Sequence, residues 1–200
     1  MSQTATMKTL RPGHTAAPEG LIESLQQGDR SAFDTLMGIH ERQVFGVAWR
    51  LLGSAEDAQD AAQEVFLRLY RFADRIDPQR PLEAWLYRVT VNVCRDLGRR
   101  RGKRRAGEVP IDEIGGDELP AGRTNNPATI ALARDEHRLV QNALIKLGEK
   151  ERAALVLRDL EGLTTQEVAQ ALGTSEGTVR THLCRARLKM KKFREKWRAS

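Results

Sequence analysis

Residues 164–188 read TTQEVAQALGTSEGTVRTHLCRARL, and they carry the clearest local pattern in the chain. Thr164 and Glu167 have the spacing of a capping box, which predicts the start of a short helix. Gly173 follows where the chain must turn, because glycine adopts left-handed backbone conformations without steric cost. Thr174 can cap a second helix that begins at Ser175. The stretch therefore predicts two helices joined by a tight turn.

The second of these helices has one apolar and one polar side. Its inward residues recur at helical spacing, and its outward face carries Arg180, Thr181, Cys184 and Arg185. Every charged residue after Val179 except Glu195 is a lysine or an arginine. A plain helical hairpin with a solvated, charged face is one interpretation. The cation density favours the other, a helix-turn-helix whose second helix enters the major groove of DNA.

Helical periodicity also fills the first half of the chain. Apolar residues recur at three- and four-residue steps from Leu21, and Gly53-Ser54 breaks the pattern. A helix then runs from Ser54 or Ala55 to about Phe72. The segment Ala73–Pro81 is expected to be a loop, since proline disfavours helical geometry in the residue before it. A further helix follows, with one apolar stripe made of Leu82, Leu86, Val89, Val93 and Leu97.

The composition changes after the basic run of residues 99–105. Ala106–Asn126 is rich in glycine, proline and acidic residues and has no helical period, which indicates a flexible linker. We expect an all-α protein of two small helical domains. The expected division is a disordered tail at 1–20, a first domain at 21–105, a linker at 106–131 and a second domain at 132–200. On such a tether, the two domains are expected to be mechanically independent.

Composition narrows the functional classes. The formal net charge is +6, which suits a polyanionic partner. Cys94 and Cys184 stand far apart and the four histidines are scattered, so we expect no metal site, no cofactor and no disulfide framework, and a reducing cytoplasm as the compartment. No apolar run approaches the length of a membrane span, so no membrane insertion is expected.

An acidic and amide-bearing stripe lies on the helix that ends near Phe72. Asp60, Gln63, Glu64 and Leu67 follow one another at helical spacing, opposite much of the apolar side of that helix. The stripe suits docking of a basic protein helix. Read alone, the stripe favours the simpler interpretation, a solvated helix face.

Two longer segments resemble one protein family. Residues 54–70 (SAEDAQDAAQEVFLRLY) and 81–101 (PLEAWLYRVTVNVCRDLGRRR) are similar to the second region of extracytoplasmic-function (ECF) sigma factors of the sigma-70 family. Residues 148–192, which contain the predicted helix-turn-helix, resemble their fourth region. The resemblance spans roughly 21–105 and 132–197. Gly148 departs from it, because many members have proline there.

The resemblance implies a role for each candidate residue. Asp60, Gln63 and Glu64 match the motif that docks on the clamp helices of core RNA polymerase. The loop Ala73–Pro81 and the following helix match the segment that holds the melted −10 element, with these candidates on the helix: Trp85, Tyr87, Arg88, Asn92 and Arg95. Stacking on aromatic rings and cation contacts to phosphate suit binding of single strands. For Trp85, packing in the core of the domain is an equal alternative. The positions that match readers of the −35 element are Arg180, Thr181, Cys184 and Arg185.

The sequence thus predicts a sigma factor that binds core polymerase, recognises promoter DNA at the −35 and −10 elements, and assists melting. It is expected not to be an enzyme itself, and an anti-sigma factor is the further partner that the resemblance implies. A free-standing helix-turn-helix repressor or activator is the first alternative. The second is an enzyme with a basic substrate cleft, which no nucleophile–base pairing, phosphate loop or metal-ligand spacing supports.

Overall fold

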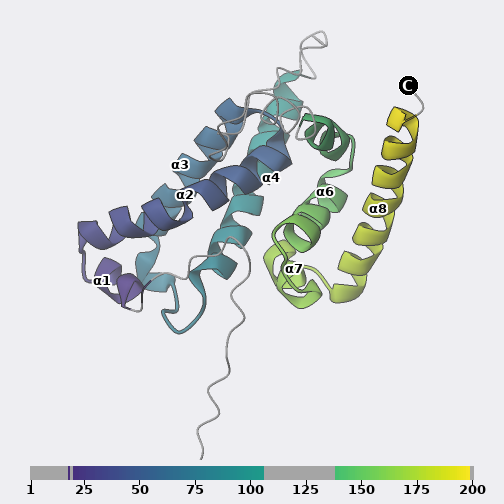
Figure 1. The fold of residues 1–200 in the computed structure, drawn as a ribbon. Coiled ribbons are helices and arrows are strands. Elements are labelled where there is room, and N and C mark those ends of the chain that lie inside the picture. The colour runs from purple at the N-terminus through teal and green to yellow at the C-terminus, as the bar shows by residue number, and fades with distance from the viewer. Residues whose placement is uncertain (1–17, 19, 106–137, 199–200) are drawn as a thin grey trace, which may run out of the picture.

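The structure, a computed structural model, describes residues 18, 20–105 and 138–198, and within these ranges all regular secondary structure is helical. The linker predicted at 106–131 and the tail predicted at 1–20, apart from residues 18 and 20, lie outside the described residues. Figure 1 shows the arrangement of the helices. The elements in chain order are α1 (Leu21–Gln26), α2 (Arg30–Leu52), α3 (Ala55–Arg71), the 3-10 turn η1 (Ala73–Arg75), α4 (Leu82–Arg105), helical residues 138–145, α6 (Glu149–Leu155), the π-helical turn η2 (Val156–Leu160), α7 (Thr165–Leu172) and α8 (Glu176–Arg198).

The first domain packs α2, α3 and α4 around one apolar core. Gly53 ends α2 with a φ of 77°, a left-handed conformation that glycine adopts readily. Ser54 then caps α3, because its side chain accepts a hydrogen bond from the Asp57 amide. The predicted break and the predicted helix after it are therefore confirmed. The inner side of α3 is apolar and buried, and it consists of Ala58, Ala61, Ala62, Val65, Phe66 and Leu69.

The second domain contains the predicted helix-turn-helix. The capping box is present, since the Thr164 hydroxyl accepts from the Glu167 amide and the Glu167 carboxylate accepts from the Thr164 amide. Gly173, with φ 63°, closes α7. The cap of α8 is one residue later than predicted. Ser175, and not Thr174, accepts from the Thr178 amide, and Thr174 belongs to the turn that ends α7, where its amide donates to the Ala169 carbonyl.

The two domains contact each other, contrary to the expectation of mechanically independent bodies. α4 packs against α7, and the end of α2 meets α6 and η2. Buried apolar residues of both domains belong to one continuous core cluster. The approach at Gly53 is so close that a Cβ atom there would lie 2.3 Å from Ile145 Cδ1. Apolar and polar groups of the second domain thus pack against complementary groups of the first domain. The composition of the linker does not predict such contacts.

Candidate nucleic-acid interface

The outward face of α8 is organised as the sequence predicts. Its inward residues, Val179, Leu183 and Ala186, are at most 5% exposed. Arg180, Thr181, Cys184 and Arg185 are all exposed. Arg180 pairs with Glu176 at 2.7 Å, but both side chains are largely in solvent, where such a pair is worth about 0–1 kcal/mol. A phosphate or a base edge can therefore replace Glu176 as the partner of Arg180 at little cost.

Some of the other cations on α8 form ion pairs within the second domain. Arg187 donates two hydrogen bonds to the Asp159 carboxylate in η2, at 3.0 and 2.7 Å, and these bonds raise the pKa of Arg187. Lys189 donates to Glu151 in α6 at 2.7 Å, which lowers the pKa of the Glu151 carboxyl group. These pairs offset part of the repulsion along α8 and fix the helix against α6 and η2.

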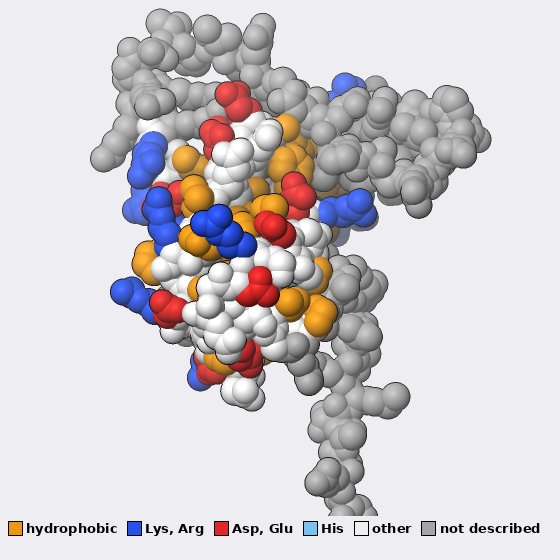
Figure 2. Space-filling view, turned by 90° about the vertical axis from the view of Figure 1, so that its left-hand side faces the viewer, with side chains coloured by type: hydrophobic (Ala, Val, Ile, Leu, Met, Phe, Trp, Pro, Cys, Tyr) orange, Lys and Arg blue, Asp and Glu red, His pale blue; other side chains and the backbone are white. Residues whose placement is uncertain are grey.

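Cations gather on α8 and, in the first domain, in the basic run of residues 99–105 at the end of α4. Among the residues that the structure describes, the side of the first domain that faces away from the second has no such concentration (Figure 2). Figure 2 shows that side with acidic, basic and apolar side chains interspersed. The positive charge of the chain is thus unevenly distributed. Its concentration at the end of α4 and on the exposed part of α8 is the pattern that phosphate contacts require.

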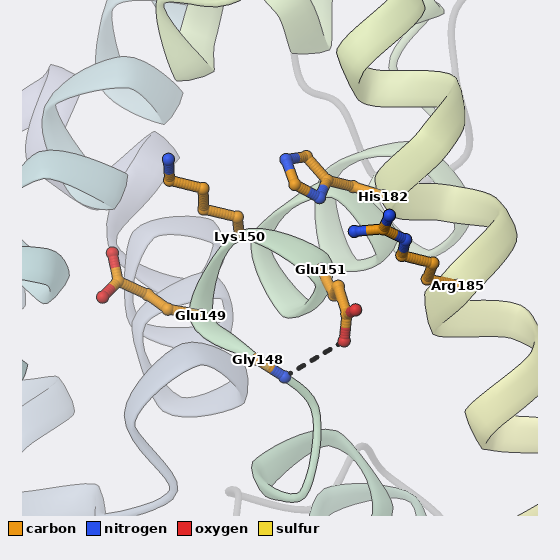
Figure 3. Close-up of a pocket in the computed structure, with 6 residues that line it drawn as sticks. All are labelled: Gly148, Glu149, Lys150, Glu151, His182 and Arg185. Carbon is orange, nitrogen blue, oxygen red and sulfur yellow. Dashed lines mark hydrogen bonds between the residues drawn. The ribbon is translucent and has the colours of Figure 1, made fainter.

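A shallow, open hollow of about 320 Å³ lies between the start of α6 and α8 (Figure 3). Glu149, Lys150 and Glu151 line it from α6, and His182 and Arg185 line it from α8. The Glu151 carboxylate accepts from the Gly148 amide at 3.2 Å, so Gly148 starts α6 without the proline of the family pattern. An open hollow that contains side chains of both signs is a poor enclosed ligand site. Among the residues that the structure describes, no three His, Cys, Asp or Glu side chains gather as a metal site.

The acidic stripe predicted on α3 lies on the surface of the protein. Asp60 and Gln63 are exposed, and Leu67 is 49% exposed. Glu64 is partly exposed and pairs with Arg68 one turn later at 2.7 Å. The opposite side of α3 is buried in the core, so packing of the first domain does not depend on the stripe. An apolar side chain that stays exposed beside two carboxylates is compatible with a basic, partly apolar partner.

The candidates on α4 do not form one open surface. Arg88 and Asn92 are exposed, whereas Trp85 is partly buried and packs against the core. Tyr87 is only 4% exposed, and its hydroxyl donates to Glu161 of the second domain at 3.2 Å. Arg95 pairs with Glu149, also of the second domain, at 2.9 Å. The partner carboxylates lie 74 and 54 residues away in sequence, so no spacing rule could have identified them.

The two cysteines are expected to react very differently. Burial, with a smaller contribution from the charge of Asp57, raises the pKa of Cys94 to about 12, so its thiol stays protonated and unreactive at neutral pH. Cys184 is exposed. Iodoacetamide at about pH 8 should therefore alkylate Cys184 alone in the folded protein, and Cys94 only after addition of urea. Mass spectrometry of tryptic peptides checks this, and rapid modification of Cys94 in the folded chain would contradict the packing of α4.

Comparison with known proteins gives matches to both domains. Residues 36–104 match the model of sigma-70 region 2, and residues 137–190 match that of sigma-70 region 4. The ECF RNA polymerase sigma factor SigE of Mycolicibacterium smegmatis is 37% identical over 179 residues, which cover 88% of this chain and 68% of that protein. The chain belongs to the ECF sigma factors.

Further relatives agree with this assignment. The RNA polymerase sigma-H factor of Pseudomonas aeruginosa is 32% identical over 84% of this sigma factor and 88% of its own length. The solved structure of CnrH in complex with the cytosolic domain of CnrY aligns with a TM-score of 0.63 and 27% identity, over 88% of this chain and 95% of CnrH. As a sigma factor, the protein directs promoter-specific initiation of transcription by RNA polymerase. None of the helices in the described ranges is long and apolar enough to cross a membrane.

Proposed function

We propose that this sigma factor contacts polymerase and promoter through three separate surfaces. The stripe of Asp60, Gln63 and Glu64 on α3 docks on the clamp helices of core polymerase. The outward face of α8 reads the −35 element in the major groove. The α4 surface, with the loop before it, takes up the melted strand of the −10 element. The polymerase supplies all catalysis, so the sigma factor is itself no enzyme, and it works in the cytoplasm where the polymerase is.

One observation favours this proposal over the alternatives. The exposed recognition face of α8 and the exposed stripe of α3 belong to different domains of one chain, and neither is needed for the packing of its own domain. A free-standing repressor needs the first surface and has no use for the second. A subunit that must bind a large enzyme and DNA at the same time needs both.

A protein that covers these surfaces is part of the same proposal. Members of the family are usually held inactive by anti-sigma factors, and the similar chain CnrH is seen in complex with another protein, the cytosolic domain of CnrY. We therefore include an anti-sigma factor among the partners of this chain. Co-purification of the tagged sigma factor from its own host, with mass spectrometry of the bound proteins, identifies it.

The −35 role of α8 is tested by Arg180→Ala and Arg185→Ala. An outward arginine can pair bidentately with guanine, and loss of one such contact costs about 1–3 kcal/mol of discrimination. We expect each variant to initiate less from promoters that have the upstream element, as measured by run-off transcription. Lys192→Ala removes the same charge farther along α8 and serves as the control. Equal transcription by all four proteins would refute the assignment of the recognition face.

A further inference from the structure

The chain between α3 and α4 starts with a tightly bonded turn. The Arg75 amide donates to the Phe72 carbonyl at 3.0 Å. The Ile76 amide donates to the Ala73 carbonyl at 2.9 Å. Ala73 and Ile76 are each 5% exposed, so they anchor the 3-10 turn η1 on the core of the first domain. Residues 77–81, which follow, are all exposed. The turn therefore sets the direction in which the exposed part of the loop leaves the domain.

A side chain of α1 holds this turn at two points. Gln26 Nε2 donates to the Ala73 carbonyl at 3.0 Å and to the Ile76 carbonyl at 2.9 Å. The side-chain amide of glutamine has two N–H donors, and both are used here. Leu25, the residue before it, is buried and fixes α1 against the core. Gln26 thus braces η1 from a helix that is itself anchored.

The turn brings an aromatic ring and a guanidinium group together at the surface. In a 3-10 turn, side chains three residues apart lie nearly one above the other. Phe72 and Arg75 have this spacing, and Arg75 Cζ lies over the Phe72 ring, 5.2 Å from its centre. Phe72 is 39% exposed, and Arg75 is exposed as well. Unpaired bases stack on surfaces of these two kinds.

The guanidinium group of Arg75 also remains able to bond phosphate. Among the residues that the structure describes, Arg75 pairs with no carboxylate, whereas the nearby Arg80 pairs with Asp77 at 3.2 Å. The planar group of an arginine presents several N–H donors that match the oxygens of a phosphate. A nucleotide at this place would therefore find a surface for its base and donors for its phosphate.

We propose that Phe72 and Arg75 form a stacking site for an unpaired base of the melted −10 element, and that Gln26 is the positioning residue that holds this site in its binding geometry. The inference rests on the proposed −10 function of α4 and the loop before it. A site that is already assembled needs little ordering of side chains when the base arrives, which lowers the entropic cost of binding. Gln26 supplies this order without touching the DNA.

Four single variants test the site and its brace. Gln26→Met removes both donors at nearly the same side-chain length, and Gln26→Asn keeps the amide but is too short to reach both carbonyl groups. Phe72→Leu removes the ring and stays apolar. Arg75→Lys keeps the charge and removes the planar group. Gln27→Met is the matched control, because the side chain of Gln27 is exposed on the neighbouring position. Circular dichroism verifies the helix content of all these proteins.

Binding is measured with holoenzyme that contains each variant, on two probes made from one promoter found by sequencing of transcript ends. The first probe is duplex and ends upstream of the −10 element. The second adds the −10 element as a single strand, and each strand is tested in turn. The ratio of the two affinities isolates the single strand, since polymerase assembly and −35 contacts are common to both probes. Each of the four variants should lower this ratio about ten-fold, and Gln27→Met should leave it unchanged.

The double variant Gln26→Met, Phe72→Leu separates positioning from a general effect on stability. If Gln26 acts through the stacking site, the double variant should have the ratio of Phe72→Leu alone. Two independent losses that multiply to about a hundred-fold would mean that Gln26 acts elsewhere, and its positioning role would be overturned. Unchanged ratios for Phe72→Leu and Arg75→Lys would overturn the stacking site itself.

The wild-type holoenzyme shows whether the proposed function has failed as well. If it binds the probe with the single strand more tightly, and all the variants do so equally, the stacking site is wrong and the −10 function of α4 and its loop stands. If the wild type binds both probes with the same affinity for either strand, the −10 function fails, and the stacking site fails with it.

Discussion

Replacement of both Asp60 and Glu64 with lysine is expected to abolish assembly of the sigma factor with core RNA polymerase. The double change converts the acidic stripe of α3 into a basic one, which would then repel the basic partner helix that we propose. Folding should survive, because Asp60 is exposed and Glu64 takes part only in a partly exposed pair with Arg68. Loss of a helical pair of this kind costs about 0.3–0.5 kcal/mol.

Co-elution with core polymerase in gel filtration measures this effect. The matched control is Asp34→Lys with Glu41→Lys, which makes the same change of charge at two exposed positions of α2. The control should co-elute with the polymerase as the wild type does. Normal co-elution of the Asp60→Lys, Glu64→Lys variant, with its helix content intact, would show that the stripe is merely a solvated face.

The largest loss of stability is expected from Leu69→Ala. Leu69 is fully buried between α3 and the rest of the first domain, and truncation of such a leucine costs about 2–5 kcal/mol. Small domains have only about 5–15 kcal/mol of stability in total. The first domain should therefore lose much of its free energy of unfolding and unfold at a clearly lower urea concentration, as followed by circular dichroism.

Leu67 provides the control for this prediction on the same helix. Its side chain is 49% exposed, so Leu67→Ala should change the free energy of unfolding by no more than about 0.5 kcal/mol. The pair of variants compares one residue type on two sides of α3. Similar urea midpoints for Leu67→Ala and Leu69→Ala would contradict the orientation of this helix and, with it, the exposure of the docking stripe.

The features that the sequence predicts well are local ones. The capping box at Thr164, the turn at Gly173 and the break at Gly53-Ser54 each depend on a few neighbouring residues. The side of a helix that is buried follows from its apolar period, which is why the outward residues of α8 and α3 are where the sequence predicts. The cap of α8 was wrong by one residue, because Thr174 and Ser175 are both good caps and Thr174 belongs to the turn that ends α7. The start of the loop predicted at 73–81 is a 3-10 turn, Ala73–Arg75.

Contacts between the domains lie beyond this kind of reasoning. Tyr87 has the type and the position of a residue that stacks on DNA, yet the structure buries it against Glu161. Arg152 reads as an ordinary charged residue of a helix, yet it bonds the end of α2. Such partners are far apart in sequence, and only the docking of one folded domain on the other brings them together.

This chain gives core RNA polymerase its choice of promoter. The most direct test is transcription of genomic DNA fragments by purified core polymerase with and without the sigma factor, followed by sequencing of the transcript ends. We expect the sigma factor to produce a discrete set of start sites that share two upstream sequence elements, and core polymerase alone to produce none of them. Identical transcript ends with and without the protein, together with tight sequence-specific binding of duplex DNA by the protein alone, would contradict this role.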